Sequence, residues 1–129
     1  MTQKKSLPPG EPVLDNKNRL MRVYFGPDST VADWKKSLKE VIRLSEETGI
    51  HCVLVDVRKQ ESLAGTVELF NFGSGLPTHL TFAVLCDLHL DEHRFIENVA
   101  TNRGITVRDF GSEQAAIDWL RETAIRDGD

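Results

Sequence analysis

The chain has 129 residues, of which 40% are hydrophobic and 28% charged, and its formal net charge at pH 7 is -4. The length fits one domain with one core, and the composition is ordinary for a globular protein. The acidic balance and the lack of a large basic cluster argue against binding to nucleic acid. No apolar run approaches the ~20 residues of a membrane span, and the first residues lack a secretory signal, so we expect a cytoplasmic protein.

A flexible N-terminal tail is expected before the domain. Residues 1–11 contain Pro8, Pro9 and Gly10 in a row and few apolar groups whose burial would offset the entropy of ordering them. A single domain is expected over residues 12–126, because no repeat or linker interrupts this part of the chain.

A β-hairpin and a helix are predicted next. Residues 12–14 and 20–25 flank a run of turn-forming residues, and we expect this hairpin at the antiparallel edge of a sheet. Thr30 and Asp33 have the spacing of a capping box, and apolar residues then recur at helical spacing as far as Gly49. The inward positions of this helix are predicted to be Val31, Trp34, Leu38, Val41, Ile42 and Ser45.

Residues 50–63 predict the central strand of the sheet and the charged loop after it. A short run of β-branched and apolar residues is typical of a strand that is buried on both faces. Residues 80–86 have the same character. We therefore expect residues 53–55 and 82–85 to be fully buried in adjacent or nearly adjacent strands.

Three more helices complete the predicted fold. One spans residues 63–72, has Ser62 as its N-cap and is unusually apolar, and the next ends before Gly104. Residues 105–110 predict the last strand, and Ser112 is predicted to cap the last helix. Its buried positions are predicted to be Ala116, Ile117, Trp119, Leu120 and Ala124. The order of elements predicts an α/β fold with about four helices and a mostly parallel central sheet.

Residues 107–120 combine an aromatic-ended strand with a helix that carries alanines and a Trp-Leu pair. This segment resembles the end of the SpoIIAA-like proteins, also called the STAS/SEC14-like family. Leu54-Val55-Asp56 and the apolar strand before Asp87 are also similar to that family, and the order of elements is similar over roughly residues 19–122. The resemblance implies a STAS-like fold and a non-enzymatic regulatory or protein-interaction module related to anti-sigma factor antagonists. The alternative that it implies is a SEC14-like carrier of a small apolar ligand or lipid.

The resemblance also implies a regulatory phosphoacceptor, which in anti-sigma factor antagonists is a Ser after a central strand. Ser62 stands at that place, with Gly65 one position later than in the family's Asp-Ser-x-Gly pattern. The other interpretation of Ser62 is a helix cap alone. The binding face around it is predicted to comprise Arg58, Glu61, Leu69, Phe70, Phe72 and Leu76. A pocket among its apolar members would favour the carrier, and a flat surface would favour a protein partner.

Three predicted strands end near an acid, and these acids are Asp56, Asp87 and Asp109. Ligands bind at the carboxyl ends of strands in open α/β sheets, so an acidic cluster there is a candidate Mg²⁺ site. The sequence favours the alternative, in which these acids cap the next helix or pair with arginines. The available arginines are Arg58, Arg103 and Arg108.

No metal site, cofactor or enzyme activity is predicted. His89 and His93 stand four residues apart, but His89 is expected to precede the helix, so the two rings would not share a face. Cys52 and Cys86 lie in predicted buried strands and are expected to be reduced thiols. The chain has no Gly-x-Ser-x-Gly elbow. We expect the partner to be either a protein or a small apolar ligand. A protein partner can be a second copy of this chain, which would make a homodimer.

Overall fold

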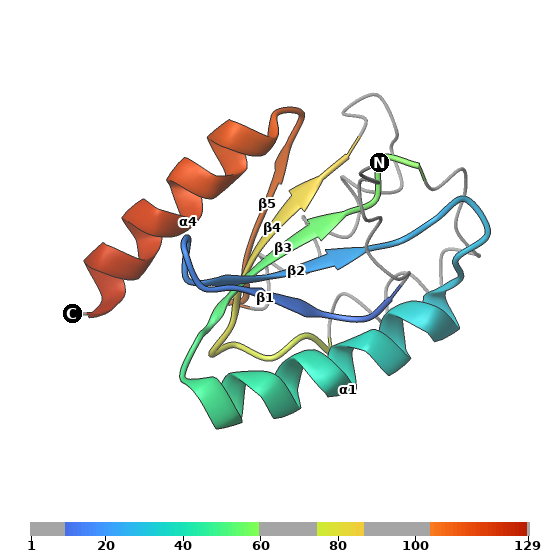
Figure 1. Cartoon of the computed structure of the whole chain (residues 1–129), viewed down its shortest axis with the longest axis horizontal. Coiled ribbons are helices and arrows are strands. Elements are labelled where there is room, and N and C mark those ends of the chain that lie inside the picture. Colours follow the sequence, from blue (N-terminus) through green and yellow to red (C-terminus); the bar gives the residue numbers. More distant parts are fainter. Residues whose placement is uncertain (1–9, 60–74, 87–103, 129) are drawn as a thin grey trace, which may run out of the picture.

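The protein is an α/β domain whose sheet lies between two helices (Figure 1). The computed structural model describes residues 10–59, 75–86 and 104–128. The described strands are β1 (Val13–Asp15), β2 (Leu20–Tyr24), β3 (Cys52–Asp56), β4 (Thr81–Leu85) and β5 (Thr106–Phe110). The described helices are α1 (Val31–Thr48) and α4 (Glu113–Gly128). The predicted helices over 63–72 and before Gly104 lie outside the described residues, so the total of about four helices stays a prediction.

The five strands lie side by side in the order β1-β2-β3-β4-β5. β1 pairs antiparallel with β2, and every other pair is parallel. The mostly parallel sheet with an antiparallel N-terminal hairpin is thus confirmed. Within that hairpin β1 forms the edge of the sheet, whereas β2 has a neighbour on both sides. β3 is the middle strand, as its apolar sequence predicts.

The hairpin turn is held by its first polar residue. The Asp15 carboxylate accepts hydrogen bonds from the backbone N–H of Asn18 at 3.1 Å and from its side-chain amide at 3.0 Å. Arg19 then has a left-handed backbone with φ of 55°. Before the hairpin, the N–H of Gly10 donates to the Tyr24 carbonyl at 2.7 Å. Most of the predicted tail, residues 1–9, lies outside the described residues.

Both ends of α1 follow from local sequence. The Thr30 hydroxyl accepts from the N–H of Asp33 at 3.3 Å, and the Asp33 carboxylate accepts from the N–H of Thr30 at 2.9 Å. This reciprocal pair is the predicted capping box. Gly49 ends the helix with φ of 78°, and its N–H donates to the Ser45 carbonyl at 2.9 Å. Trp34 is buried on the inner side of the helix, as predicted.

The Ser112 hydroxyl caps α4 by accepting from the N–H of Ala115 at 3.3 Å, as predicted. The helix continues to Gly128, two residues beyond the expected end of the domain. Ala124 is exposed and the prediction that it is buried is wrong, because the inward stripe passes instead through Thr123. The Thr123 hydroxyl donates to the Trp119 carbonyl at 2.8 Å within the same helix, which satisfies it in a buried position.

Alternate residues of each strand face the two helices, which lie on opposite sides of the sheet (Figure 1). The cluster on the α1 side includes Met21, Val23, Val53, Phe82 and Val107. The cluster on the α4 side consists of Leu20, Cys52, Leu54, Ala83, Leu85, Ala116, Ile117 and Leu120.

Val55 and Val84 are only half-buried, so the prediction that residues 53–55 and 82–85 are all fully buried is wrong at these two positions. Both line a cavity on the α1 side, so part of the surface of each side chain faces the cavity. Cys52 and Cys86 are buried reduced thiols, as expected. Neither described helix is long and apolar enough to cross a membrane.

Candidate functional site

An apolar cavity of about 70 Å³ lies between α1 and the sheet. Its α1 wall contains Trp34, Ser37, Leu38 and Val41, and Leu76 contributes from the segment before β4. The sheet supplies the floor. The floor residues are Val23, Phe25, Val53, Val55, Val57, Phe82, Val84, Val107 and Asp109.

The centre of the floor is one row of residues that crosses four parallel strands. Val23 is the register partner of Val55, Val55 of Val84, and Val84 of Asp109. Each of the four is the second-last residue of its strand. Since ligands of open α/β sheets bind toward the carboxyl ends of the strands, the row lies where a ligand site is expected.

The wall of the cavity is almost entirely apolar. Ser37 and Asp109 are the polar residues among its described lining, and both are largely or partly buried. A water molecule finds few hydrogen-bond partners in an apolar cavity, so such a cavity binds apolar molecules instead. Its volume is about half of the ~150 Å³ that accommodates benzene in an engineered cavity. It is therefore large enough for a short alkyl group or part of one ring, and too small for an acyl chain.

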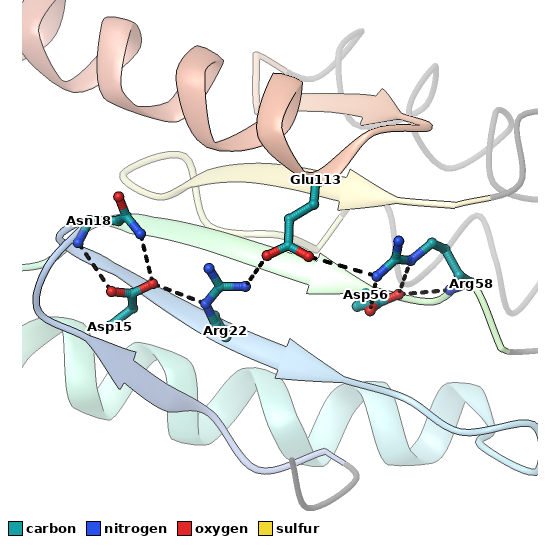
Figure 2. A network of polar contacts seen from close by, with 6 residues as sticks. All are labelled: Asp15, Asn18, Arg22, Asp56, Arg58 and Glu113. Carbon is teal, nitrogen blue, oxygen red and sulfur yellow. Dashed lines mark hydrogen bonds and ion pairs between the residues drawn. The ribbon is translucent and has the colours of Figure 1, made fainter. Parts of the chain in front are cut away.

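The opposite side of the sheet carries an ion-pair network, which consists of Asp15, Asn18, Arg22, Asp56, Arg58 and Glu113 (Figure 2). The Arg22 guanidinium donates to Asp15 at 3.0 Å and to Glu113 at 2.8 Å. Arg58 donates to both carboxylate oxygens of Asp56, at 3.0 and 2.8 Å, and lies 3.9 Å from Glu113. Glu113, in the first turn of α4, thus stands between the two arginines and joins the helix to β2 and to the end of β3.

These contacts shift the protonation equilibria of the network. Burial raises the pKa of Asp56, but hydrogen bonds from the side chain and N–H of Arg58 lower it by more, to below 3.8. Burial likewise raises the pKa of Asp15, and hydrogen bonds from Asn18 and Arg22 reverse that effect and lower it. The hydrogen bond to Asp56 raises the pKa of Arg58. The lowered pKa values of Asp15 and Asp56 and the raised pKa of Arg58 therefore keep these three groups charged at neutral pH.

The predicted acidic cluster is not formed by the described acids. Asp56 aligns with Leu85, whereas Asp109 aligns with Val84, one position earlier, so the two carboxylates leave opposite faces of the sheet. Asp56 pairs with Arg58, which is the arrangement that the sequence favours. Asp87 lies outside the described residues. Within the described ranges no group of three or more His, Cys, Asp or Glu side chains is placed to hold a metal ion.

The predicted binding face is represented by two residues in the described part of the chain. Leu76 is buried and lines the cavity on the α1 side. Arg58 has a side chain that is 44% exposed, and it reaches toward Glu113 on the α4 side. The other predicted members of this face are Glu61, Leu69, Phe70 and Phe72, and they lie outside the described residues, as does the predicted phosphoacceptor Ser62.

Sequence reasoning did not predict a role for Arg22, Glu113 or Val84. Arg22 and Glu113 are 91 positions apart, and nothing local marks them as partners. The sequence does contain a signal for a role of Arg22, because this charged residue stands on an otherwise apolar side of a strand. A charged side chain that is partly buried there requires a partner of opposite charge. For Val84 the apolar run predicts burial but contains no information about the space beside it.

Comparisons of the chain with protein-family models, with curated proteins and with solved structures find no match. The cavity and the ion-pair network are therefore interpreted from their own geometry.

Proposed function

We propose that this protein is a non-enzymatic STAS-like module that binds a small apolar ligand in the cavity between α1 and the sheet. The observation that carries the proposal is the row Val23, Val55, Val84 and Asp109, which leaves apolar space near the carboxyl ends of four strands. Leu76, a predicted member of the binding face, is part of the wall. A cytoplasmic location belongs to the same proposal and rests on the sequence.

The size of the cavity selects the class of ligand. About 70 Å³ holds a short alkyl group or part of a ring, while the remainder of a ligand would extend out of the cavity. Ser37 and Asp109 can accept hydrogen bonds, so a compact apolar ligand with one donor group fits the wall better than a pure hydrocarbon. A complete lipid, which the SEC14-like alternative would require, exceeds the cavity that these residues line.

The proposal is tested with fluorobenzene as a probe of the cavity. Titration of the full chain should shift the methyl NMR signals of Val55, Val84 and Leu38, and ¹⁹F spectra should show exchange with a bound form. Native mass spectrometry of the freshly purified protein should in parallel show whether a small ligand is retained.

Matched variants separate binding in the cavity from binding elsewhere. Val84→Phe fills the cavity and should abolish the fluorobenzene shifts, and Leu38→Phe should do the same from the opposite wall. Val13→Phe makes the same change on half-buried β1, away from the cavity, and should bind as the wild type does. A dispersed NMR spectrum verifies that each variant folds. Equal binding by all four proteins, or no binding by the wild type, would refute the proposal.

Arg58 favours a second candidate, a regulatory protein-interaction module resembling anti-sigma factor antagonists. Its side chain is 44% exposed, and its guanidinium is held in place by Asp56 and Glu113, so little side-chain entropy would be lost when a partner binds it. Arg58 precedes the predicted phosphoacceptor Ser62 by four positions. An arginine fixed near a phosphorylated serine is a common element of phosphate-controlled interactions.

A pull-down with five proteins tests this second candidate. A regulatory partner should be recovered by the wild type and Ser62→Ala, and lost with Ser62→Asp and with Arg58→Ala. Phe70→Asp should reduce recovery if the predicted apolar face takes part. Sedimentation equilibrium of the same proteins tests the expected homodimer. Identical recovery by all variants would remove this face from consideration.

A further inference from the structure

His51 and His79 form a pair at the end of the sheet opposite the carboxyl ends of the strands. His51 directly precedes β3, and His79 lies two residues before β4. The two ring centres are 5.8 Å apart, with an angle of 84° between the ring planes. Both residues are exposed. The pair is separate from the cavity row, which lies near the carboxyl ends of the same strands.

The backbone at both histidines is fixed although the rings are exposed. The His51 carbonyl accepts a hydrogen bond from the N–H of Thr81 at 2.9 Å, which joins the two segments where β3 and β4 begin. Ile50 and Leu80, the neighbours of the two histidines, are buried in the core. The two side chains therefore start from fixed positions, and only their exposed torsions have to adjust for both rings to contact one ligand.

We propose that His51 and His79 together bind one divalent transition-metal ion. Imidazole nitrogens suit Cu²⁺, Ni²⁺ and Zn²⁺. Metal–nitrogen bonds of about 2.0–2.1 Å place the centres of two rings on one ion roughly 4.5–6.4 Å apart, and the value depends on the angle between the two bonds. The observed separation of 5.8 Å falls within that range.

The described part of the chain contributes two ligands to the site, and it contains no group of three metal-binding side chains. Water completes the coordination of the ion. Such a site binds reversibly, and the order of affinity follows the general series in which Cu²⁺ exceeds Ni²⁺ and Zn²⁺. The bound ion links the beginning of β3 to the segment before β4 and so stabilises the folded state.

Titration of the untagged full chain with Cu²⁺ tests the site. We expect one equivalent to bind, with an electron paramagnetic resonance spectrum that shows two nitrogen ligands. His51→Ala and His79→Ala should each weaken binding by roughly tenfold or more, since the second imidazole binds intramolecularly. The His51→Ala/His79→Ala variant should lose the site. Both residues are exposed, so these variants should fold normally.

The chain contains a natural control in its other two histidines, His89 and His93. The variant His89→Ala/His93→Ala should keep the Cu²⁺ stoichiometry and affinity of the wild type. Zn²⁺ in about hundredfold excess over its dissociation constant should raise the melting temperature of this control by several degrees and leave His51→Ala/His79→Ala unchanged. Equal binding by the two double variants, or loss of binding in the His89→Ala/His93→Ala variant alone, would overturn the proposal.

Discussion

The two faces of the sheet use alternate residues of the same strands but are packed in different ways. On the α4 side Ala83, Leu85 and Leu120 are at most 1% exposed and belong to one buried cluster. On the α1 side, Val55 and Val84 are half-buried and border a cavity, although Val84 lies between Ala83 and Leu85 in the chain. One face thus supplies close packing, and the other keeps space for a ligand near the carboxyl ends of the strands.

The ion pairs on the two sides of the sheet also differ. α4 lies across β3, β4 and β5, and the ion-pair network occupies the area beside it, over β1, β2 and the end of β3 (Figure 2). On the α1 side, the arginine Arg43 pairs with Glu40 and Glu47 on the exposed surface of the helix. The α4 side therefore uses ion pairs to join distant elements, whereas the pairs on α1 remain within one helix.

The comparison is most strongly tested by the same substitution in the two helices. Leu120→Ala, in α4, should lower the free energy of unfolding by about 3–5 kcal/mol because it opens a new hole in a closely packed cluster. Leu38→Ala, in α1, should cost only about 1–2 kcal/mol, since this side chain is half-buried and borders existing space. Urea denaturation measures both values. Equal losses would mean that the two faces are equally well packed.

Enlarging two adjacent residues of β4 makes the converse test. Ala83→Leu inserts volume into the closely packed α4 side and should cost about 1–3 kcal/mol. Val84→Leu extends one methylene group toward the cavity and should change the free energy of unfolding by less than about 1 kcal/mol. Thermal denaturation of the two variants gives the difference. If Val84→Leu were as damaging as Ala83→Leu, the cavity would not be available to a ligand.

The sequence predicts the elements better than the space between them. The capping box of Thr30 and Asp33, the left-handed Gly49 and the middle position of β3 follow from local patterns, because each depends on residues close in the chain. The cavity depends on how far α1 lies from the sheet, and this distance is set by packing across many residues. Pattern alone therefore predicts Val84 to be buried but does not predict the space beside it.

The sequence also predicts only part of the ion-pair network, for a different reason. Asp56 and Arg58 are two positions apart, and their pairing can be predicted from the sequence. Arg22 and Glu113 meet only because β2, β3 and α4 assemble, so no local signal connects them. The inward stripe of α4 shows the problem on a small scale, since a shift of one residue places Thr123 inside and Ala124 outside.

The third test removes one arginine from each side of the molecule. Arg22→Met should lower the free energy of unfolding by about 1–2 kcal/mol at neutral pH, because Asp15 and Glu113 lose a partly buried partner. Arg43→Met is the matched control on the surface of α1 and should cause a smaller loss. Equal losses would show that the network contributes no more than exposed ion pairs.

The pH dependence sharpens this third test. Hydrogen bonds lower the pKa of Asp15 in the folded protein below 3.8, the ordinary value that applies to the unfolded chain. The contribution of Asp15 to stability is therefore fully present at pH values above that ordinary pKa. The contribution is lost as the pH falls through the lowered pKa of the folded state. The difference between wild type and Arg22→Met, measured by urea denaturation, should therefore be constant above about pH 5 and shrink as the pH decreases through 3.8. A difference that stays constant to lower pH would contradict a contribution of Arg22 to the lowered pKa of Asp15.

The smallest effects are expected where each helix satisfies its own buried hydroxyl group. Ser45 in α1 donates to the Ile42 carbonyl at 2.8 Å, and Thr123 in α4 donates to the Trp119 carbonyl at the same distance. Ser45→Ala removes a hydrogen bond but gains helix propensity, and Thr123→Val keeps the shape of the side chain. Both variants should change the free energy of unfolding by less than about 0.5 kcal/mol. Thermal denaturation that shows a large loss on one side only would mean that buried polar groups, and not packing alone, distinguish the two faces.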